Sequence, residues 1–331
     1  MQIHRTAVLA TLGILLQACT TVPATQTPAR ITTFYDAVIR DHDNRIVDLE
    51  TVAKTLAGAD VVVVGEFHGH QGAHLLQARL QAALHQRNPR QILALEAFNL
   101  DSQTPVNRYL AGELGEEEMV EDAGAWENYQ ASYRPMVEYA REHDLPVVAA
   151  NAPADVVRCV GRQGAGYLEA LPGQRRSQLP DQPFPAMTGY RDRFMTSMGG
   201  SDHGEPSKEG KQRLENTFKA QLLRDSTMAD QILKALNAHP DHQVLMITGT
   251  FHSENRQGLV AVLEQRAPEL EVRVLTPHMS ANQSEAESNT DVAVGDYRYD
   301  LWPLPAHYQD RDREQAAMME RFSKARNLTC D

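Results

Sequence analysis

The sequence contains no run of basic residues, and acidic side chains outnumber basic ones. Its 331 residues include 44 Asp and Glu against 32 Lys and Arg, a formal net charge of −12. Proteins that bind nucleic acid through the phosphate backbone carry a basic patch or stripe. The sequence therefore predicts no nucleic-acid partner.

Two common catalytic motifs are also absent. The chain has no His-Glu-x-x-His, the helical zinc motif of many metallopeptidases, and no Gly-x-Ser-x-Gly, the nucleophile elbow of many serine hydrolases. Any hydrolytic chemistry would therefore need another arrangement of residues.

The first 19 residues have the pattern of a secretory signal. Arg5 is followed by an apolar run over 7–16 that is too short for a permanent membrane span. The run ends in Leu-Gln-Ala-Cys, which resembles a bacterial lipobox, so we predict a lipoprotein signal peptide over 1–19 and lipidation of Cys19, with palmitate among the acyl chains. The alternative is an ordinary signal peptide cut near Ala18. Thr20 is not the aspartate that retains many lipoproteins at the inner membrane, so we expect a periplasm-facing protein anchored to the outer membrane through its lipid.

A linker rich in Pro and Thr over 20–30 precedes an α/β domain, which we place at 31–305, and a polar C-terminal tail at 306–331. Cys159 and Cys330 could pair in an oxidising compartment, and the sequence leaves this open. Apolar runs bounded by turn residues predict buried strands. These runs are 60–65, 91–97, 145–150, 243–248 and 271–275.

Near-continuous Val, Ile, Leu and Ala in such runs is typical of a mostly parallel sheet flanked by helices on both faces. Residues 151–242 separate the third and fourth main strands, so we predict a helical subdomain inserted there, within about 105–240. Helical patterns occur at 74–87, 135–143 and 213–236. The stretch 183–206 has Pro, Gly and Met without periodicity and is predicted to be a long functional loop.

Titratable side chains follow the predicted strands. In open parallel sheets, ligands bind outside the carboxyl ends of the strands. Gly65 and Gly249 are expected to let the backbone turn so that a histidine three residues later lies over the sheet edge. The residues expected to meet there are Glu66, His68, Glu96 and His252.

Two imidazoles and two carboxylates suit a divalent transition metal, Zn, Mn, Fe or Co. Such a metal would activate water for hydrolysis, and either Glu66 or Glu96 could instead act as general base. The alternative is that these side chains only cap helices or form salt bridges.

Several segments, in order, resemble the ChaN-like haem-binding lipoproteins, within a wider group that includes the Tiki proteases and, more distantly, the erythromycin esterases. The resemblance covers most of 34–305. Its segments are VVVVGEFHGHQGAH, ILALEAF, WENYQASYRPMVEYAREHDLPVVAANAP, KAQLLRDSTMADQI, VLMITGTFH and DYRYDLWPLP.

The resemblance implies a haem-binding envelope lipoprotein that acts in haem or iron uptake, with haem held through a tyrosine, a histidine nearby, and a homodimer that could share haem. Our choice of ligand is Tyr190, because phenolate oxygen suits ferric iron, with Arg191 and Arg193 pairing with propionates. Rival tyrosines are Tyr129, Tyr133 and Tyr167. The alternative function is a metal-dependent hydrolase, a peptidase or esterase of the Tiki-like type.

Overall fold

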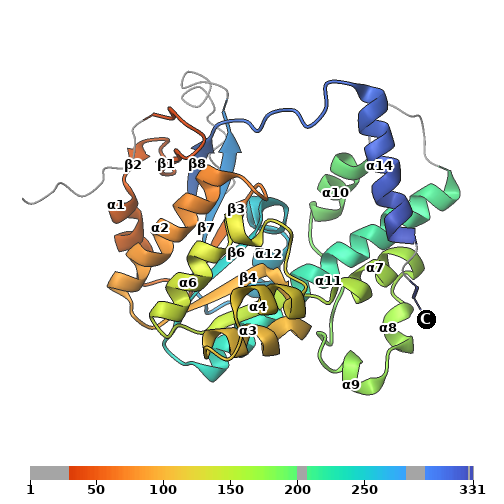
Figure 1. Ribbon diagram of the computed structural model, residues 1–331, viewed down its shortest axis with the longest axis horizontal. Coiled ribbons are helices and arrows are strands. Elements are labelled where there is room, and N and C mark those ends of the chain that lie inside the picture. The colour runs from red at the N-terminus through yellow and green to blue at the C-terminus, as the bar shows by residue number, and fades with distance from the viewer. Residues whose placement is uncertain (1–29, 200–206, 281–294, 327–328, 331) are drawn as a thin grey trace, which may run out of the picture.

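The computed structural model describes residues 30–199, 207–280, 295–326 and 329–330 (Figure 1). The predicted signal peptide, Cys19 and most of the linker lie outside these residues. Within the described part of the chain, no helix is both long enough and apolar enough to cross a membrane.

An eight-stranded mixed sheet forms the centre, in the order β2-β1-β8-β7-β3-β6-β4-β5. The strands from β8 to β5 are parallel to one another, whereas β1 and β2 add antiparallel pairs at one edge. The mostly parallel α/β fold is as predicted. Strand bounds are β1 (Val38–Arg40), β2 (Ile46–Val47), β3 (Val61–Glu66), β4 (Gln91–Asn99), β5 (Val147–Asn151), β6 (Gln243–Gly249), β7 (Val272–Met279) and β8 (Tyr297–Leu301).

Two cores cover the two faces of the sheet, which explains why its strands are apolar throughout. Successive side chains of a strand point to opposite faces, so Val62 and Val64 belong to one core while Val61 and Val63 belong to the other. Helices α1 (Leu49–Leu56), α2 (Gln71–Arg87) and α6 (Arg134–Glu142) pack in the first core, and α11 (Lys208–Ala238) and α12 (Leu259–Arg266) pack in the second.

Helices fill the intervals between strands, as the helical patterns predict. Between β4 and β5 lie η1 (Leu100–Ser102), α3 (Gln103–Leu110), α4 (Glu116–Ala123), α5 (Tyr129–Ser132) and α6. Between β5 and β6 lie α7 (Ala154–Gln163), α8 (Tyr167–Ala170), α9 (Gly173–Arg176), α10 (Tyr190–Gly199) and α11. Figure 1 shows this second group at one side of the sheet, with α11 joining it to the second core. This group is the predicted inserted subdomain.

The prediction of a continuous loop over 183–206 is wrong in its middle part, because Tyr190–Gly199 forms α10. Tyr190 and Phe194, one helical turn apart, are buried together with Phe218 of α11. This packing between helices, rather than local periodicity, stabilises α10.

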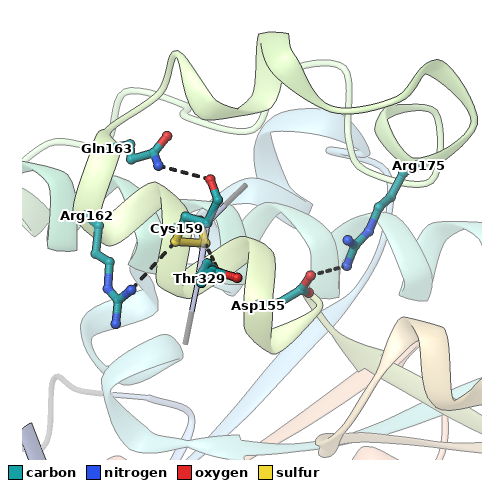
Figure 2. The surroundings of a disulfide bond; sticks show 7 residues. Asp155, Cys159, Arg162, Gln163, Arg175 and Thr329 are labelled. Atoms are coloured by element: carbon teal, nitrogen blue, oxygen red, sulfur yellow. Dashed lines mark hydrogen bonds and ion pairs between the residues drawn. A yellow bond between two sulfur atoms is a disulfide. The ribbon is translucent and has the colours of Figure 1, made fainter. Parts of the chain in front are cut away.

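The C-terminal segment contains a helix and is tied to the subdomain. Residues Arg311–Arg326 form α14, and Cys330 forms a disulfide with Cys159 of α7. Figure 2 shows the disulfide beside Gln163, whose side-chain amide donates to the carbonyl of Cys330 (3.2 Å). The two cysteines left open by the sequence are therefore paired.

Candidate functional site

Neighbouring parallel strands bring the predicted site residues to one edge of the sheet. Glu66 ends β3, Glu96 lies near the end of β4, and His252 follows β6 in the short helix η2 (Thr250–His252). Because β6 pairs with both β3 and β4, the three side chains meet where these strands end. The carboxyl edge is the expected place for a ligand site in such a sheet.

Glu66 is a buried carboxylate whose oxygens are surrounded by hydrogen-bond donors. Its Oε1 accepts from the Tyr133 hydroxyl (2.5 Å) and from Nδ1 of His68 (2.8 Å). Its Oε2 accepts from the Gln77 amide (2.9 Å) and lies 3.4 Å from Nδ1 of His74. Burial alone raises the pKa of Glu66, but the hydrogen bond from His68 and the charges of both histidines hold the pKa below its usual value. Glu66 is therefore ionised.

His68 is fixed at Nδ1 by Glu66, and its Nε2 makes no hydrogen bond to any residue that the structure describes. A Cβ built on Gly249 would lie 2.8 Å from His68 Nε2, so the imidazole rests directly against the Gly249 backbone. Gly65 and Gly249 both have non-positive φ angles and lie in strands. They provide space for close contacts, which corrects the prediction that they serve as turn residues. The His68 side chain is 45% exposed, and Trp126 packs edge-on against its ring at 4.9 Å.

Glu96 and His252 form a second buried pair. Glu96 Oε2 accepts from the Thr248 hydroxyl (2.8 Å) and from the Gly249 amide (2.7 Å), while its Oε1 lies 3.4 Å from His252 Nε2. Although burial raises the pKa of Glu96, the nearby charges of His252 and His68 lower it far below its usual value. The opposite holds for His252. Burial lowers its pKa, but its acidic neighbours raise the pKa to about 10. His252 is thus a cation at neutral pH.

The second of those acidic neighbours is Asp225 of α11, which was not among the predicted site residues. Its Oδ1 accepts from His252 Nδ1 (2.7 Å), and its Oδ2 accepts from the Tyr190 hydroxyl (2.8 Å). The Gln221 amide also donates to the Tyr190 oxygen (3.2 Å). A chain of hydrogen bonds therefore runs from Tyr190 through Asp225 to His252.

These groups lie at a cavity of about 640 Å³, within the size range of small-molecule sites, roughly 300–1,000 Å³. Polar residues along its wall are Glu66, His68, Glu96, Gln221, Arg224, Thr250 and His252. Apolar side chains along it are Phe67, Trp126, Met198, Phe251, Met279 and Leu304. The cavity thus combines an ionised edge with apolar walls.

The structure does not support the predicted metal centre. Among the described residues, no group of three or more His, Cys, Asp or Glu side chains is arranged to hold a metal ion. The physical reason is that the carboxylate oxygens already accept hydrogen bonds, and both nitrogens of His252 face carboxylates. The same bonds make Glu66 and Glu96 weak general bases, because they stabilise the ionised forms. His68 is the better-placed base.

The sequence matches the model of one protein family. The family described as haem-binding uptake, Tiki superfamily, ChaN matches residues 52–263, which is more than half of the sequence. The chain belongs to this family. The matched span contains the whole ionised edge of the cavity, from Glu66 to His252.

Solved structures similar to this chain have low sequence identity to it. The structure of ChaN of Campylobacter jejuni, which shows cofacial haem binding, has a TM-score of 0.58 and 16% identity, and the alignment covers 81% of this chain and 97% of that one. This likeness shows the fold. A mutant of the erythromycin esterase EreC in its open conformation has a TM-score of 0.44 and 14% identity, covering 84% of this chain and 86% of that one.

One curated relative is the chloroplastic protein RETICULATA-RELATED 5 of Arabidopsis thaliana, which is 26% identical over 259 residues. The match covers 73% of this chain but 34% of that protein. The ChaN-family chain thus spans about a third of the length of this relative.

The three residues predicted to contact haem lie outside the lining of the cavity in this ChaN-family chain. Tyr190 is fully buried, and burial beside Asp225 raises the pKa of its phenol well above the usual value. Arg191 pairs with Glu215 on the surface. The Arg193 guanidinium donates to Glu254 (2.8 Å) and to the Phe251 carbonyl (2.8 Å).

Three residues of the site were not singled out from the sequence: Gln221, Arg224 and Asp225. A signal for Asp225 does exist, because Phe218, Leu222 and Asp225 recur at helical spacing and are all buried. An acidic residue on the apolar stripe of a helix needs a buried partner. Tyr133, which the sequence suggested only as a rival haem ligand, lies at the junction of two short helices and donates to Glu66.

Proposed function

We propose that the protein binds haem in the cavity at the carboxyl edge of the sheet, as a step in haem or iron uptake. The observation that carries this proposal is the family match over 52–263, which includes the ionised edge of the cavity. The fold shared with ChaN of Campylobacter jejuni supports it.

His68 is the side chain in the cavity best suited to hold the haem iron. Its Nδ1 donates to Glu66, and a carboxylate on the second nitrogen fixes the ring and makes the first nitrogen a stronger ligand. The apolar wall that would contact the haem ring includes Trp126, Met198 and Met279. Tyr190 fits less well in this conformation, because its hydroxyl is enclosed and already donates to Asp225.

Titration of the purified protein with ferric haem, followed by absorbance, tests this proposal. We expect binding, with a spectrum changed or lost in His68→Ala and unchanged in both Tyr190→Phe and the control His85→Ala, which lies at Tyr139 outside the cavity. A tyrosinate charge-transfer band that is lost in Tyr190→Phe would show that Tyr190, and not His68, is the iron ligand. If the unmodified protein does not bind haem, the proposed function is wrong.

The proposed location is the periplasmic face of the outer membrane, through a lipid on Cys19. The Leu-Gln-Ala-Cys sequence supports this, as does the disulfide, since such bonds persist in oxidising compartments such as the periplasm. Cys19→Ala should move the protein from the membrane to the soluble fraction. Retention of that variant in the membrane would contradict the anchor.

A second candidate function, hydrolysis without a metal ion, is favoured by the Glu66–His68 pair. Glu66 raises the pKa of His68 above its usual value despite burial, and the free Nε2 could take a proton from a water molecule attacking an ester. Hydrolysis of a chromogenic ester should then survive EDTA, be lost in His68→Ala, and persist in His85→Ala. Loss of activity on chelation would contradict this mechanism.

A further inference from the structure

Arg224 is a cation at the cavity wall that makes no hydrogen bond or close ion pair with any described residue, although its neighbours on α11 do. The residue is partly buried and lines the cavity beside Glu96 and His252. Burial lowers its pKa, while Glu96 and Asp225 raise it. A guanidinium keeps its charge in proteins and presents five N–H donors. None of the Arg224 nitrogens is among the fully buried unpaired atoms of the described residues, so these donors open to the cavity.

The two nearby carboxylates supply charge to Arg224 but no acceptor. Glu96 uses Oε2 for Thr248 and Gly249, and its Oε1 faces His252. Asp225 uses Oδ1 for His252 and Oδ2 for Tyr190. His252, held protonated, neutralises part of this negative charge. The guanidinium thus remains available to an acceptor that enters the cavity.

The remaining walls describe the rest of such a ligand. Phe67, Trp126, Met198, Met279 and Leu304 give the cavity an apolar lining away from the ionised edge. A ligand that satisfies both parts has an apolar body and at least one anionic group. Guanidinium matches carboxylate geometrically, because two parallel N–H groups meet two oxygens.

We propose that Arg224 is an anion-binding residue of the cavity, and that it binds a carboxylate of an otherwise apolar ligand. This rests on the proposed function in placing the ligand in the same cavity. If the ligand is haem, the carboxylate is a propionate. If the ligand is an ester substrate, the carboxylate belongs to that substrate.

The first test compares ferric haem with its dimethyl ester, in which both propionates are neutral. The unmodified protein should bind the free acid about tenfold more tightly or better, as expected for a hydrogen bond to a charged group. In Arg224→Gln this preference should fall to about one, and Arg224→Lys should keep part of it. Arg191→Gln is the matched control, since Arg191 pairs with Glu215 on the surface and does not line the cavity.

The second test needs neither haem nor a variant that folds. The unmodified protein is treated with phenylglyoxal, which modifies arginine, and the modification of Arg224 is quantified by mass spectrometry. Benzoate, a small apolar carboxylate, should protect Arg224, whereas its neutral counterpart benzamide should not. Arg191 on the surface serves as an internal control whose modification neither compound changes.

The outcomes separate this proposal from haem binding itself. A preference for haem over its dimethyl ester that depends on Arg224 supports a propionate as the bound anion. Equal binding of haem and its ester, or no haem binding, together with protection by benzoate, supports an anion site for another carboxylate. Absence of both discrimination and protection overturns the proposal, even if haem binds.

Discussion

His252 is enclosed by two carboxylates, so its charge is coupled to the stability of the fold. Its pKa is about 10 in the folded protein and about 6.5 in the unfolded chain. Because the folded pKa is the higher one, His252 contributes its full stability below about pH 6.5 and loses it as the pH rises toward 10. Between pH 7 and 9 this group should lower the free energy of unfolding by up to about 1.4 kcal/mol per pH unit.

Urea unfolding of the unmodified protein and of His252→Gln at pH 7, 8 and 9 measures this effect. At pH 7 the variant should be less stable by about 3–5 kcal/mol, because Asp225 loses its buried partner. The difference should then shrink as the pH rises. The control is His85→Gln, since burial lowers the pKa of His85 and it is neutral in both states above pH 7. A difference that stays constant across this range would contradict a protonated His252.

Gly249 sets the position of His68, and a single methyl group tests this. In Gly249→Ala the new Cβ would lie 2.8 Å from His68 Nε2 and 3.0 Å from its Cε1. The half-exposed imidazole should move away from Glu66, so haem affinity should fall about 10–100-fold, as for loss of a partner that orients a ligand. The cost to stability should stay within about 1–3 kcal/mol. Absorbance titration and urea unfolding measure the two effects.

The matched control for this substitution is Gly58→Ala. No atom lies within 4 Å of the Cβ that Gly58 would gain, so haem affinity and stability should both be unchanged. If Gly249→Ala binds haem as tightly as this control, His68 does not contact haem.

At the residue scale, the sequence predicts the site best where titratable side chains come directly after a strand. Glu66, Glu96 and His252 could be brought together in advance, because parallel strands end at one edge and each residue lies at such an end. Arg224 and Asp225 come from a helix, and which of its faces points to the cavity depends on tertiary packing. The choice of Tyr190 failed to anticipate its burial for the same reason, since the composition of a segment does not orient a side chain.

At the scale of elements, α10 is stabilised by its contacts rather than by its sequence. Phe194 is 1% exposed and packs against Phe218 and Phe251. Phe194→Ala should lower the free energy of unfolding by about 3–5 kcal/mol, and amide hydrogen exchange along α10 should rise most. Thr196→Ala, an exposed position on the same helix, is the control. Equal protection in both variants would mean that α10 forms without Phe194.

The elements that sequence patterns predict are those with long apolar runs. Strands β3, β4 and β6 are buried on both faces and therefore read as continuous Val, Ile, Leu and Ala. The strands β1 and β2, near one edge of the sheet, have three and two residues, too few for any pattern. The place of β1 depends on pairing with β8, which is distant in sequence, and β2 in turn pairs with β1.

For the whole molecule, the sheet connects distant parts of the chain and the disulfide connects its C-terminal segment to the helical subdomain. Cys159 and Cys330 are 171 residues apart in sequence, so the bond removes many conformations from the unfolded chain. Figure 1 shows α14 on the same side of the molecule as the subdomain. The sequence could not decide this pairing, because the distance between two cysteines depends on the complete fold.

The disulfide should therefore contribute to global stability. Cys330→Ser should lower the free energy of unfolding by about 2–4 kcal/mol, the usual range for such a bond. Cys330 is the better site for this change, because Cys159 is 1% exposed and a polar hydroxyl there would be buried. Urea unfolding with and without a reducing agent provides the measurement. Reduction should bring the unmodified protein to the level of the variant and leave the variant unchanged, and a variant as stable as the oxidised protein would show that the bond stabilises only the end of the chain.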